Sequence, residues 1–389
     1  MDNSSPTALL DLARNRYDST LELLERMVMT ESPTGDAPGV TSVAEQVRGL
    51  FAEHDPEVVA HEGEWGTHLV MDIPGAGVQR DAAPVLFIGH SDTVWPTGTL
   101  EKMPFRIEGD LAYGPGLFDM KSGLLIMHQG LSVSTELGLS RPPVRVVVVG
   151  DEEVGSPSSG ELLRDSAEGV SAVLGFESPH PGGGLKVGRL GSTRLRLQIT
   201  GRASHAALDP EGGVNAIEEL VDQILALREI IGSAEDTAPG GVLCNVGTIS
   251  GGGKTNVVPA VATVEVGLRF RTPEVEEKVL ASIRELSPVR PDAQLEVETL
   301  SQRHAWQADV ADEKLLAVVE QAASDAGLAA VGGRPAAGAG DTNFFGSLGL
   351  PTLDGFGPDG AGAHAAHEQV RLESIPERIA LLAALLARL

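Results

Sequence analysis

The spacing of apolar residues predicts alternating helices and strands in the first half of the chain. Over residues 6–30, apolar side chains recur every three or four positions with charged residues between them, which is the period of an amphipathic helix. Two further helices are predicted at 40–54 and 122–137. Short apolar runs rich in β-branched residues, typical of strands buried on both faces, occupy 85–88, 144–149 and 172–176. Helices between buried strands indicate an α/β layer fold.

The pattern changes near residue 189. From 193 to 200, apolar and polar residues alternate, which is the period of a strand with one buried face. A helix, two strands, a helix and a strand follow at 214–231, 242–249, 260–270, 274–286 and 294–300. This βαββαβ order is that of a ferredoxin-like α+β unit. The α/β pattern then resumes, with predicted elements at 313–326, 351–353 and 374–389.

These patterns predict one α/β domain that is interrupted by an inserted domain. The α/β domain, with a mixed sheet, comprises residues 1–188 and 301–389, and the inserted α+β domain comprises 189–300. A length of 389 residues and a hydrophobic content of 42% are sufficient for separate cores.

The charge balance excludes two classes of partner. Lys and Arg number 29 against 55 Asp and Glu, a formal net charge of −26. Such a field repels nucleic acids and anionic membranes, and no apolar stretch approaches the roughly 18 residues of a membrane span. Residues 1–20 lack the basic and apolar segments of a secretory signal, so we expect a cytoplasmic location. The single cysteine, Cys244, excludes an intramolecular disulfide and a Cys-rich metal site.

Residues able to bind metal follow three of the predicted buried strands. In open α/β sheets, ligand sites form beyond the carboxyl ends of the strands, so these residues are expected to share one site. A glycine-rich loop and a His-containing loop near the C-terminus add further candidates. The candidate residues are His90, Asp92, Asp119, Glu152, Glu153, Glu177 and His364.

The chemistry of this set favours divalent cations. Carboxylates in one pocket raise each other's pKa unless a cation neutralises them. Imidazole and carboxylate without thiolate suit Zn²⁺, Co²⁺ or Mn²⁺. Two His and three carboxylates suffice for two ions that share one Asp and hold a hydroxide between them. Ordinary roles stay open at this point: His90 as a surface residue, Glu152 and Glu153 as a solvated pair, and Asp119 as a turn or cap residue.

Eight motifs occur in a fixed order from about residue 85 to the C-terminus. They are GHSDTV, GPGLFDMKSG, GDEEVGS, FES, GRASHAA, KTNVVPA, GDTNFF and GAHAAHEQV. In this order they resemble the M20 family of di-zinc metallopeptidases, and within it the glutamate carboxypeptidase (carboxypeptidase G2-like) branch. The family fold is a zinc-exopeptidase-like catalytic α/β domain interrupted by a ferredoxin-like dimerisation or lid domain. That organisation agrees with the elements predicted above.

The resemblance implies a role for each candidate in the α/β domain. The implied zinc ligands are His90 and Glu177 for one ion, Glu153 and His364 for the other, and Asp119 as the bridge. Asp92 would hydrogen-bond His90 and so fix its tautomer, and Glu152 would be the general base. Glu at position 177, where di- and tripeptidases of the family tend to carry Asp, favours the carboxypeptidase and deacylase branches.

The closing motif leaves one ligand ambiguous. The family's His-x-x-x-Glu pattern selects His364 together with Glu368. His367 lies three residues after His364, and the spacing within the family is not rigid. His364 is the preferred ligand, with His367 as the alternative.

Residues of the inserted domain are implied to act on the substrate. The family counterpart of His205 reaches the active site of the partner subunit and stabilises the oxyanion, which makes the homodimer part of catalysis. Asn256 and Arg269 match positions that hold the substrate's carboxylate, a role that suits the planar, bidentate guanidinium. A surface role remains the alternative for Arg269, and Arg303 is a weaker candidate.

The function implied is metal-dependent hydrolysis of the amide bond in N-acyl amino acids or C-terminal peptide linkages. A hydroxide bridging two zinc ions would attack the carbonyl, with Glu152 as general base. The substrate would be a small molecule or short peptide with a free carboxylate. An N-acyl amino acid deacylase of the aminoacylase, acetylornithine or succinyl-diaminopimelate type is the alternative. A remote alternative is an inactive binding protein on the same fold.

Overall fold

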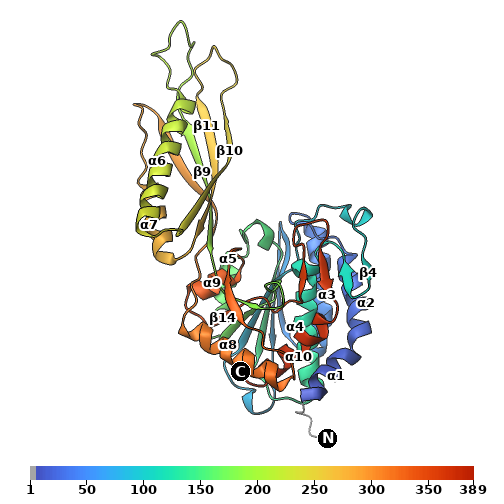
Figure 1. The fold of residues 1–389 in the computed structure, drawn as a ribbon. Helices are drawn as coiled ribbons and strands as arrows, with labels where there is room; N and C mark the ends of the chain where they lie inside the picture. The colour runs from blue at the N-terminus through green and yellow to red at the C-terminus, as the bar shows by residue number, and fades with distance from the viewer. Residues whose placement is uncertain (1–5) are drawn as a thin grey trace. The chain divides into compact units, whose positions relative to one another are not determined.

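The computed structural model describes residues 6–389 and divides the chain into two compact units (Figure 1). Unit 1 comprises the chain up to Gly188 together with Ala308–Ala336 and Gly340–Leu389, and unit 2 comprises Arg189–Gln307 with Ala337–Ala339. The second boundary lies at 307 and not at 300, because β12 continues to Arg303 and Trp306 still forms a β-bridge with Arg189.

Unit 1 is built on a six-stranded mixed sheet. In spatial order its strands are β1 (Glu57–Gly63), β2 (Gly66–Ile73), β6 (Val144–Val149), β3 (Val85–His90), β7 (Ala172–Gly175) and β14 (Thr352–Leu353). The strands β6, β3, β7 and β14 are parallel to one another, whereas β1 and β2 join antiparallel. The predicted α/β fold with a mixed sheet is confirmed. The carboxyl ends of β6, β3 and β7 therefore meet at one edge of the sheet.

Helices cover both faces of this sheet. They are α1 (Pro6–Asn15), α2 (Tyr17–Val28), α3 (Ala37–Phe51), α4 (Ser122–Glu136), α5 (Gly160–Ser166), α8 (Val310–Asp325), α9 (Thr342–Ser347) and α10 (Ser374–Leu386). Alternate residues of β3 enter opposite cores: Phe87 joins the large cluster under α4 and α10, and Ile88 joins a smaller one with Leu163 of α5 and Phe345 of α9. Burial on both faces explains the continuous apolar runs of the central strands.

The single helix predicted over 6–30 is divided into two. Arg16 lies between α1 and α2 with non-helical backbone angles, φ −91° and ψ 1°. The hydroxyls of Ser19 and Thr20 donate to the carbonyl of Arg16 at 2.9 and 2.8 Å. Such local bonds from Ser and Thr offer the backbone an alternative to a continuous helix.

Two small sheets, which the sequence did not predict, complete unit 1. One has the order β15 (Gly360–Ala361), β16 (Gln369–Arg371), β5 (Leu111–Tyr113) and β4 (Arg106–Glu108), and the other pairs β13 (Gly333–Ala336) with β8 (Leu185–Arg189). The first sheet ties the loop that contains His364 to the strand that precedes the glycine-rich loop.

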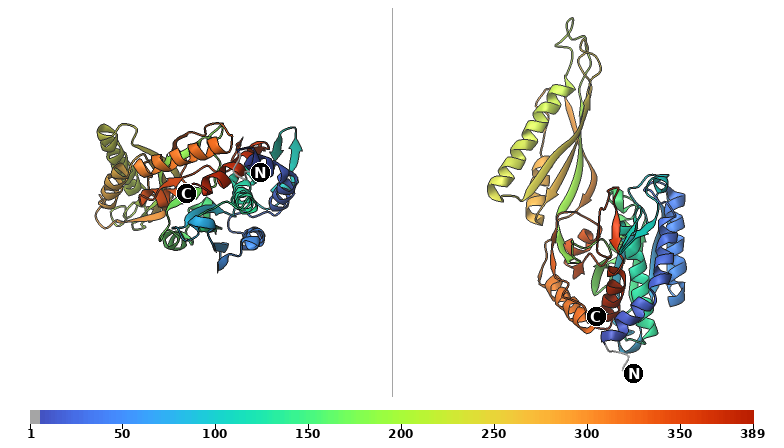
Figure 2. Two further views of the ribbon diagram at one scale, coloured as in Figure 1. Left: turned by 90° about the horizontal axis from the view of Figure 1, so that it is seen from below. Right: turned by 45° about the vertical axis from the view of Figure 1, so that its right-hand side comes forward.

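Unit 2 is a βαββαβ unit, as predicted. Its elements are β9 (Gly191–Thr200), α6 (Ala216–Thr237), β10 (Val242–Gly251), β11 (Val261–Phe270), α7 (Pro273–Arg284) and β12 (Gln294–Arg303). The strands form an antiparallel sheet of order β10-β11-β9-β12. Both helices cover one face of it (Figures 1 and 2), and α6, α7 and the strands share one apolar core.

Among residues 6–389, no helix combines the length and apolarity needed to cross a bilayer.

Candidate metal centre

The ends of three neighbouring strands bring candidate ligands together in unit 1. His90 is the last residue of β3 and lies opposite Val149, the last residue of β6. A short 3-10 turn, Glu152–Val154, follows β6 and carries Glu152 and Glu153. Glu177 follows β7. The parallel arrangement thus places these side chains at one edge of the sheet, where the sequence predicted a site.

Two sets of ligands share Asp119. His90 Nε2 lies 3.4 Å from Asp119 Oδ1 and 3.4 Å from Glu177 Oε1. His364 Nε2 lies 3.2 Å from Asp119 Oδ2 and 3.3 Å from Glu153 Oε2. Each oxygen of Asp119 therefore lies near a different His, and each of these two His lies near a different Glu.

The residues fit divalent metal ions. His90 Nε2 and Glu153 Oε1 are buried and have no hydrogen-bond partner, an arrangement that costs free energy unless something else binds these atoms. Two ligands of one tetrahedral ion, with bonds of about 2.0–2.1 Å, lie about 3.3 Å apart. The separations of 3.2–3.4 Å match that value. The donor set, with imidazole and carboxylate only, is one that zinc, cobalt and manganese accept.

Asp92 has a wider role than the predicted contact with His90. Its backbone carbonyl lies 3.0 Å from His90 Nδ1 and its Oδ1 lies 3.3 Å from the same atom. Since the carbonyl can only accept, Nδ1 carries the proton of the neutral imidazole, the form that binds metal, and Nε2 keeps its lone pair. The Asp92 carboxylate also accepts from the backbone N–H groups of Glu152 (3.3 Å) and Glu153 (3.2 Å) and from Thr34 Oγ1 (2.7 Å). The Asp92 side chain thus connects the segment that follows β3 to the turn Glu152–Val154 that follows β6.

The electrostatics of the centre favour positive charge. Although burial lowers it, contacts with Asp119, Asp92 and Glu177 raise the pKa of His90 well above its usual value. Hydrogen bonds with Asp119 and Glu153 raise the pKa of His364 to about 10. Burial and the charge of Asp119 raise the pKa of Glu177. The centre therefore favours added positive charge, carried either by protons on the two imidazoles and Glu177 or by bound cations.

His364, and not His367, faces Asp119 and Glu153. His364 adopts a left-handed backbone conformation, φ 61°, which is uncommon for a residue other than glycine. His367 is exposed to solvent. The unusual backbone of His364 turns its imidazole into the ligand cluster.

Glu368 is a site residue whose role the sequence did not show. Its side chain is buried and accepts from the backbone N–H groups of Gly116 (2.8 Å), Phe118 (2.9 Å) and Asp119 (3.1 Å) and from Trp95 Nε1 (2.6 Å). It therefore fixes the glycine-rich loop that carries Asp119. The motif His-x-x-x-Glu was the only signal for it, and that signal did not reveal which groups the Glu binds.

His205 and Asn256 lie together in unit 2. The backbone N–H of Ala206 donates to the carbonyl of Asn256 at 3.1 Å, and His205 pairs with Val257 in a β-bridge. His205 is exposed, and its Nδ1 accepts from the N–H groups of Ala207 and Leu208 at 3.2 and 3.1 Å. The proton of a neutral His205 is therefore on Nε2, which points away from these bonds as a free donor.

Arg269 lies at the other end of the same sheet. It is eight residues beyond Val261, the first residue of β11, and so ~27 Å along the strand at about 3.4 Å per residue. Arg269 and Arg303 pair with opposite sides of Ser192 on β9. Burial and the charge of Arg303 lower the pKa of Arg269. The structure thus brings Arg269 next to Arg303 but separates it from Asn256 of the same chain.

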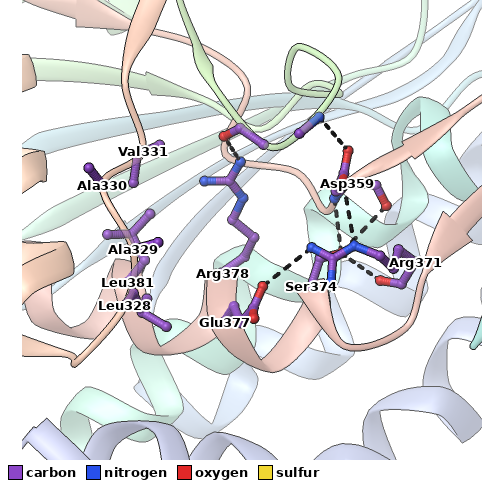
Figure 3. Close-up of a pocket in the computed structure, with 12 residues that line it drawn as sticks. Leu328, Ala329, Ala330, Val331, Asp359, Arg371, Ser374, Glu377, Arg378 and Leu381 are labelled. Carbon is purple, nitrogen blue, oxygen red and sulfur yellow. Dashed lines mark hydrogen bonds and ion pairs between the residues drawn. The ribbon is translucent and has the colours of Figure 1, made fainter.

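A cavity of about 240 Å³ elsewhere in unit 1 is lined by none of the predicted site residues. It lies between the segment Leu328–Val331 and the start of α10 (Figure 3). Arg371 contacts Asp359 and Glu377 there, whereas Arg378 donates to the carbonyl of Gly183.

The fold and the centre together define a class of protein: a metallohydrolase with an α/β unit and a separate α+β unit. Comparison with known families agrees. The pattern of Peptidase family M20/M25/M40 matches residues 86–388, and the chain belongs to this family. The resemblance drawn from the eight motifs is confirmed, and with it the classification as a metal-dependent, carboxypeptidase-like hydrolase.

Individual relatives support the same classification. Carboxypeptidase G2 from Pseudomonas sp. (strain RS-16) is 30% identical over 388 residues, which are 97% of this chain and 91% of that protein. Succinyl-diaminopimelate desuccinylase from Maricaulis maris (strain MCS10) is 32% identical over 199 residues, 48% of this chain and 50% of that protein. An M20 family metallo-carboxypeptidase from Sulfolobus solfataricus shares the fold, with a TM-score of 0.71 and 16% identity over 95% of this chain and 98% of that one.

Proposed function

We propose that this M20 enzyme hydrolyses the amide bond of N-acyl amino acids or of C-terminal peptide linkages, as a glutamate carboxypeptidase does. The observation that carries the proposal is the pair of ligand sets that share Asp119. We assign one zinc ion to His90, Glu177 and Asp119, and a second to His364, Glu153 and Asp119; cobalt or manganese would suit the same donors. When bound, such ions polarise a carbonyl oxygen and acidify water.

Glu152 is the proposed general base. Its side chain is buried, and one of its carboxylate oxygens lies within 4.8 Å of ligand atoms of His90 and Glu177. Asp92 holds the backbone N–H of Glu152, so the carboxylate is kept beside the ligands. In this role Glu152 takes a proton from the attacking water and passes it to the leaving amine.

His205 is the proposed oxyanion donor. Because its Nδ1 accepts two backbone N–H bonds, its Nε2–H donates without the ring having to become charged. A donor of this kind stabilises charge that develops on the carbonyl oxygen in the transition state.

Asn256 and Arg269 are proposed to bind the substrate's carboxylate from different copies of the chain. In one copy they are separated by the length of β11, too far for both to contact one small anion. The two like charges of Arg269 and Arg303 raise each other's free energy, which an anionic substrate would relieve. In a homodimer, unit 2 of one copy would supply His205 and Asn256 to the other copy. Asn256 of one chain and Arg269 of the other would then bind the same substrate.

The surface of unit 2 supports such a homodimer. The edge strand β10 is exposed at every residue from Leu243 to Gly251, and its Leu243 and Ile249 are 61% and 60% exposed. On α6, exposed apolar residues recur one turn apart, at Ile217, Val221 and Leu225. A long apolar edge strand is a template for pairing with another chain. We propose that two copies join along β10 and α6.

A second candidate is an N-acyl amino acid deacylase. The 32% identity with a desuccinylase over 199 residues favours it. The inactive binding protein is not favoured, because the chain retains Glu152 and all five candidate ligands. The cytoplasmic location stays a prediction.

A substrate panel tests the proposal. Zinc-loaded protein would be assayed with folate-type glutamate conjugates, N-acetylated amino acids, succinylated diamino acids and dipeptides. We expect the highest kcat/KM on a glutamate conjugate. Preference for an acetylated or succinylated amino acid would establish the deacylase instead, and no hydrolysis of any member by the zinc-, cobalt- or manganese-loaded protein would contradict the proposed function.

A further inference from the structure

We propose that Glu53, His54 and His128 form a third metal site in unit 1, separate from the candidate metal centre, that binds one zinc-type divalent ion. His54 ends the 3-10 turn Ala52–His54 that follows α3, and His128 lies in the middle of α4. No residue of this cluster is among the predicted ligands. We refer to Glu53, His54 and His128, with Ser132, as the α3–α4 cluster.

The donor atoms of the α3–α4 cluster have the spacing of ligands around one ion. Glu53 Oε1 lies 3.0 Å from His128 Nε2 and 3.5 Å from His54 Nε2. Ser132 Oγ lies 3.3 Å from His54 Nε2 and 3.4 Å from His128 Nε2, and it also hydrogen-bonds Glu53 Oε1. Ligands of a tetrahedral ion lie about 3.3 Å apart. In the candidate metal centre the corresponding separations are 3.2–3.4 Å, close to the 3.0 and 3.5 Å from Glu53 to the two His.

Packing holds the two imidazoles in place. His54 and His128 are 9% and 4% exposed, and their ring centroids are 5.5 Å apart. Phe51 packs edge-on against His128 at 5.5 Å and against His54 at 6.2 Å. Rings fixed in this way lose little conformational freedom when they bind an ion. Two imidazoles and one carboxylate are a recurrent zinc donor set.

The cluster remains accessible to an ion and leaves one coordination position open. The Glu53 side chain is 54% exposed, so an ion can enter from solvent beside it. Water or the Ser132 hydroxyl would complete a tetrahedron. Arg16 and Arg141 act electrostatically on His54 and repel a cation, so we expect weaker binding than at the metal centre, whose ligands include three carboxylates.

The bound ion would join two helices. Glu53 and His54 belong to the turn after α3, and His128 and Ser132 belong to α4. The helix α4 begins at Ser122, soon after Asp119. The role that follows is structural, a link between α3 and α4, and the reaction does not depend on it.

Metal counting tests the third site. Untagged protein would be equilibrated with excess zinc, freed of unbound metal, and analysed by plasma mass spectrometry. We expect three ions per chain in the wild type and two in both His128→Gln and His54→Gln, with unchanged kcat. The matched control is His61→Gln, which alters an exposed His on β1 and should keep three ions.

The outcomes separate this site from the proposed function. Two ions per chain in the wild type, in His128→Gln and in His54→Gln would overturn the third site and leave the metal centre untouched. Loss of an ion together with loss of kcat in both cluster variants would also overturn the assignment, because the ion would then belong to the reaction. Circular dichroism of both variants checks that neither loses its ion because it has misfolded.

Discussion

The metal centre of unit 1 and the sheet of unit 2 differ in what each leaves unsatisfied. In unit 1, buried polar atoms such as His90 Nε2 and Glu153 Oε1 have no hydrogen-bond partner. In unit 2, apolar side chains such as Leu243 and Ile249 are exposed along a sheet edge. The first costs free energy that a cation would offset, and the second costs free energy that a second copy would offset. From this difference we expect metal ions to complete unit 1 and a second copy of the chain to complete unit 2.

The largest effect is expected from Glu152→Gln in unit 1. Because the amide cannot accept the proton, kcat should fall by about 10²–10⁴. The ligand sets remain, so the metal content should not change. Steady-state kinetics and metal analysis of the same preparation check both statements. Near-normal turnover would remove Glu152 from the role of general base.

Substitution in unit 2 should affect the same reaction. His205→Ala should lower kcat by about 10²–10³, the usual effect of losing one oxyanion donor. If His205 serves the partner's site, mixing His205→Ala with Glu152→Gln should recover activity, since a mixed dimer contains one site with both groups. Mixed samples no more active than the two parents would show that His205 does not act across a dimer.

Assembly should depend on the exposed edge of β10. Ile249→Asp places a charge on this edge, and we expect a shift from dimer to monomer in analytical ultracentrifugation. The activity should fall together with the dimer. The control is Val59→Asp, at an apolar residue of the edge strand β1; Val59 is 49% exposed and Ile249 is 60% exposed. A dimer that persists in Ile249→Asp, or dissociates equally in Val59→Asp, would contradict the proposed interface.

The smallest expected effect is on stability, and it concerns Glu276, a buried carboxylate that accepts hydrogen bonds from other residues of unit 2. Glu276 accepts from Gln302 Nε2, His304 Nδ1 and the N–H of Ala305, at 2.9, 2.9 and 2.7 Å. Although burial raises it, these bonds lower the pKa of Glu276, and the bond to Glu276 raises the pKa of His304. Bonds to charged groups contribute about 1.5–3 kcal/mol, so Glu276→Gln should lower the free energy of unfolding by that amount.

The pH dependence of this stabilisation follows from the directions of the two pKa shifts, downward for Glu276 and upward for His304. The contribution of Glu276 is present above its ordinary pKa of 4.5 and is lost as the pH falls. The contribution of His304 is present below its ordinary pKa of 6.5 and is lost as the pH rises through its raised pKa. Urea unfolding should therefore show the largest difference between wild type and Glu276→Gln at pH 4.5–6.5. A difference independent of pH would contradict the ion pair.

The fold class, and the strand ends at which the candidate ligands meet, were predictable because both depend on local patterns. Buried strands are continuous apolar runs; His90 ends one of them, and Glu153 and Glu177 lie within four residues of the ends of two others. The break at Arg16 was not predictable from apolar spacing, since it arises from hydroxyl bonds of Ser19 and Thr20.

Features that depend on contacts between distant segments could not be predicted. Glu368 binds backbone groups about 250 residues earlier in the chain, and no pattern near it reveals those partners. The separation of Asn256 from Arg269 follows from the register of β11, which the motifs alone do not contain. The family resemblance assigned both residues to one carboxylate without showing that one chain cannot bring them together.

The measurement that tests the central claim most directly is the metal content of Asp119→Ala. Asp119 offers one oxygen to each ligand set, so its loss should remove two ions per chain relative to the wild type, together with hydrolysis. Unit 2 contains no part of this cluster and should keep its fold, as judged by circular dichroism. A variant that keeps both ions, or loses only one, would contradict a centre built on a shared Asp119.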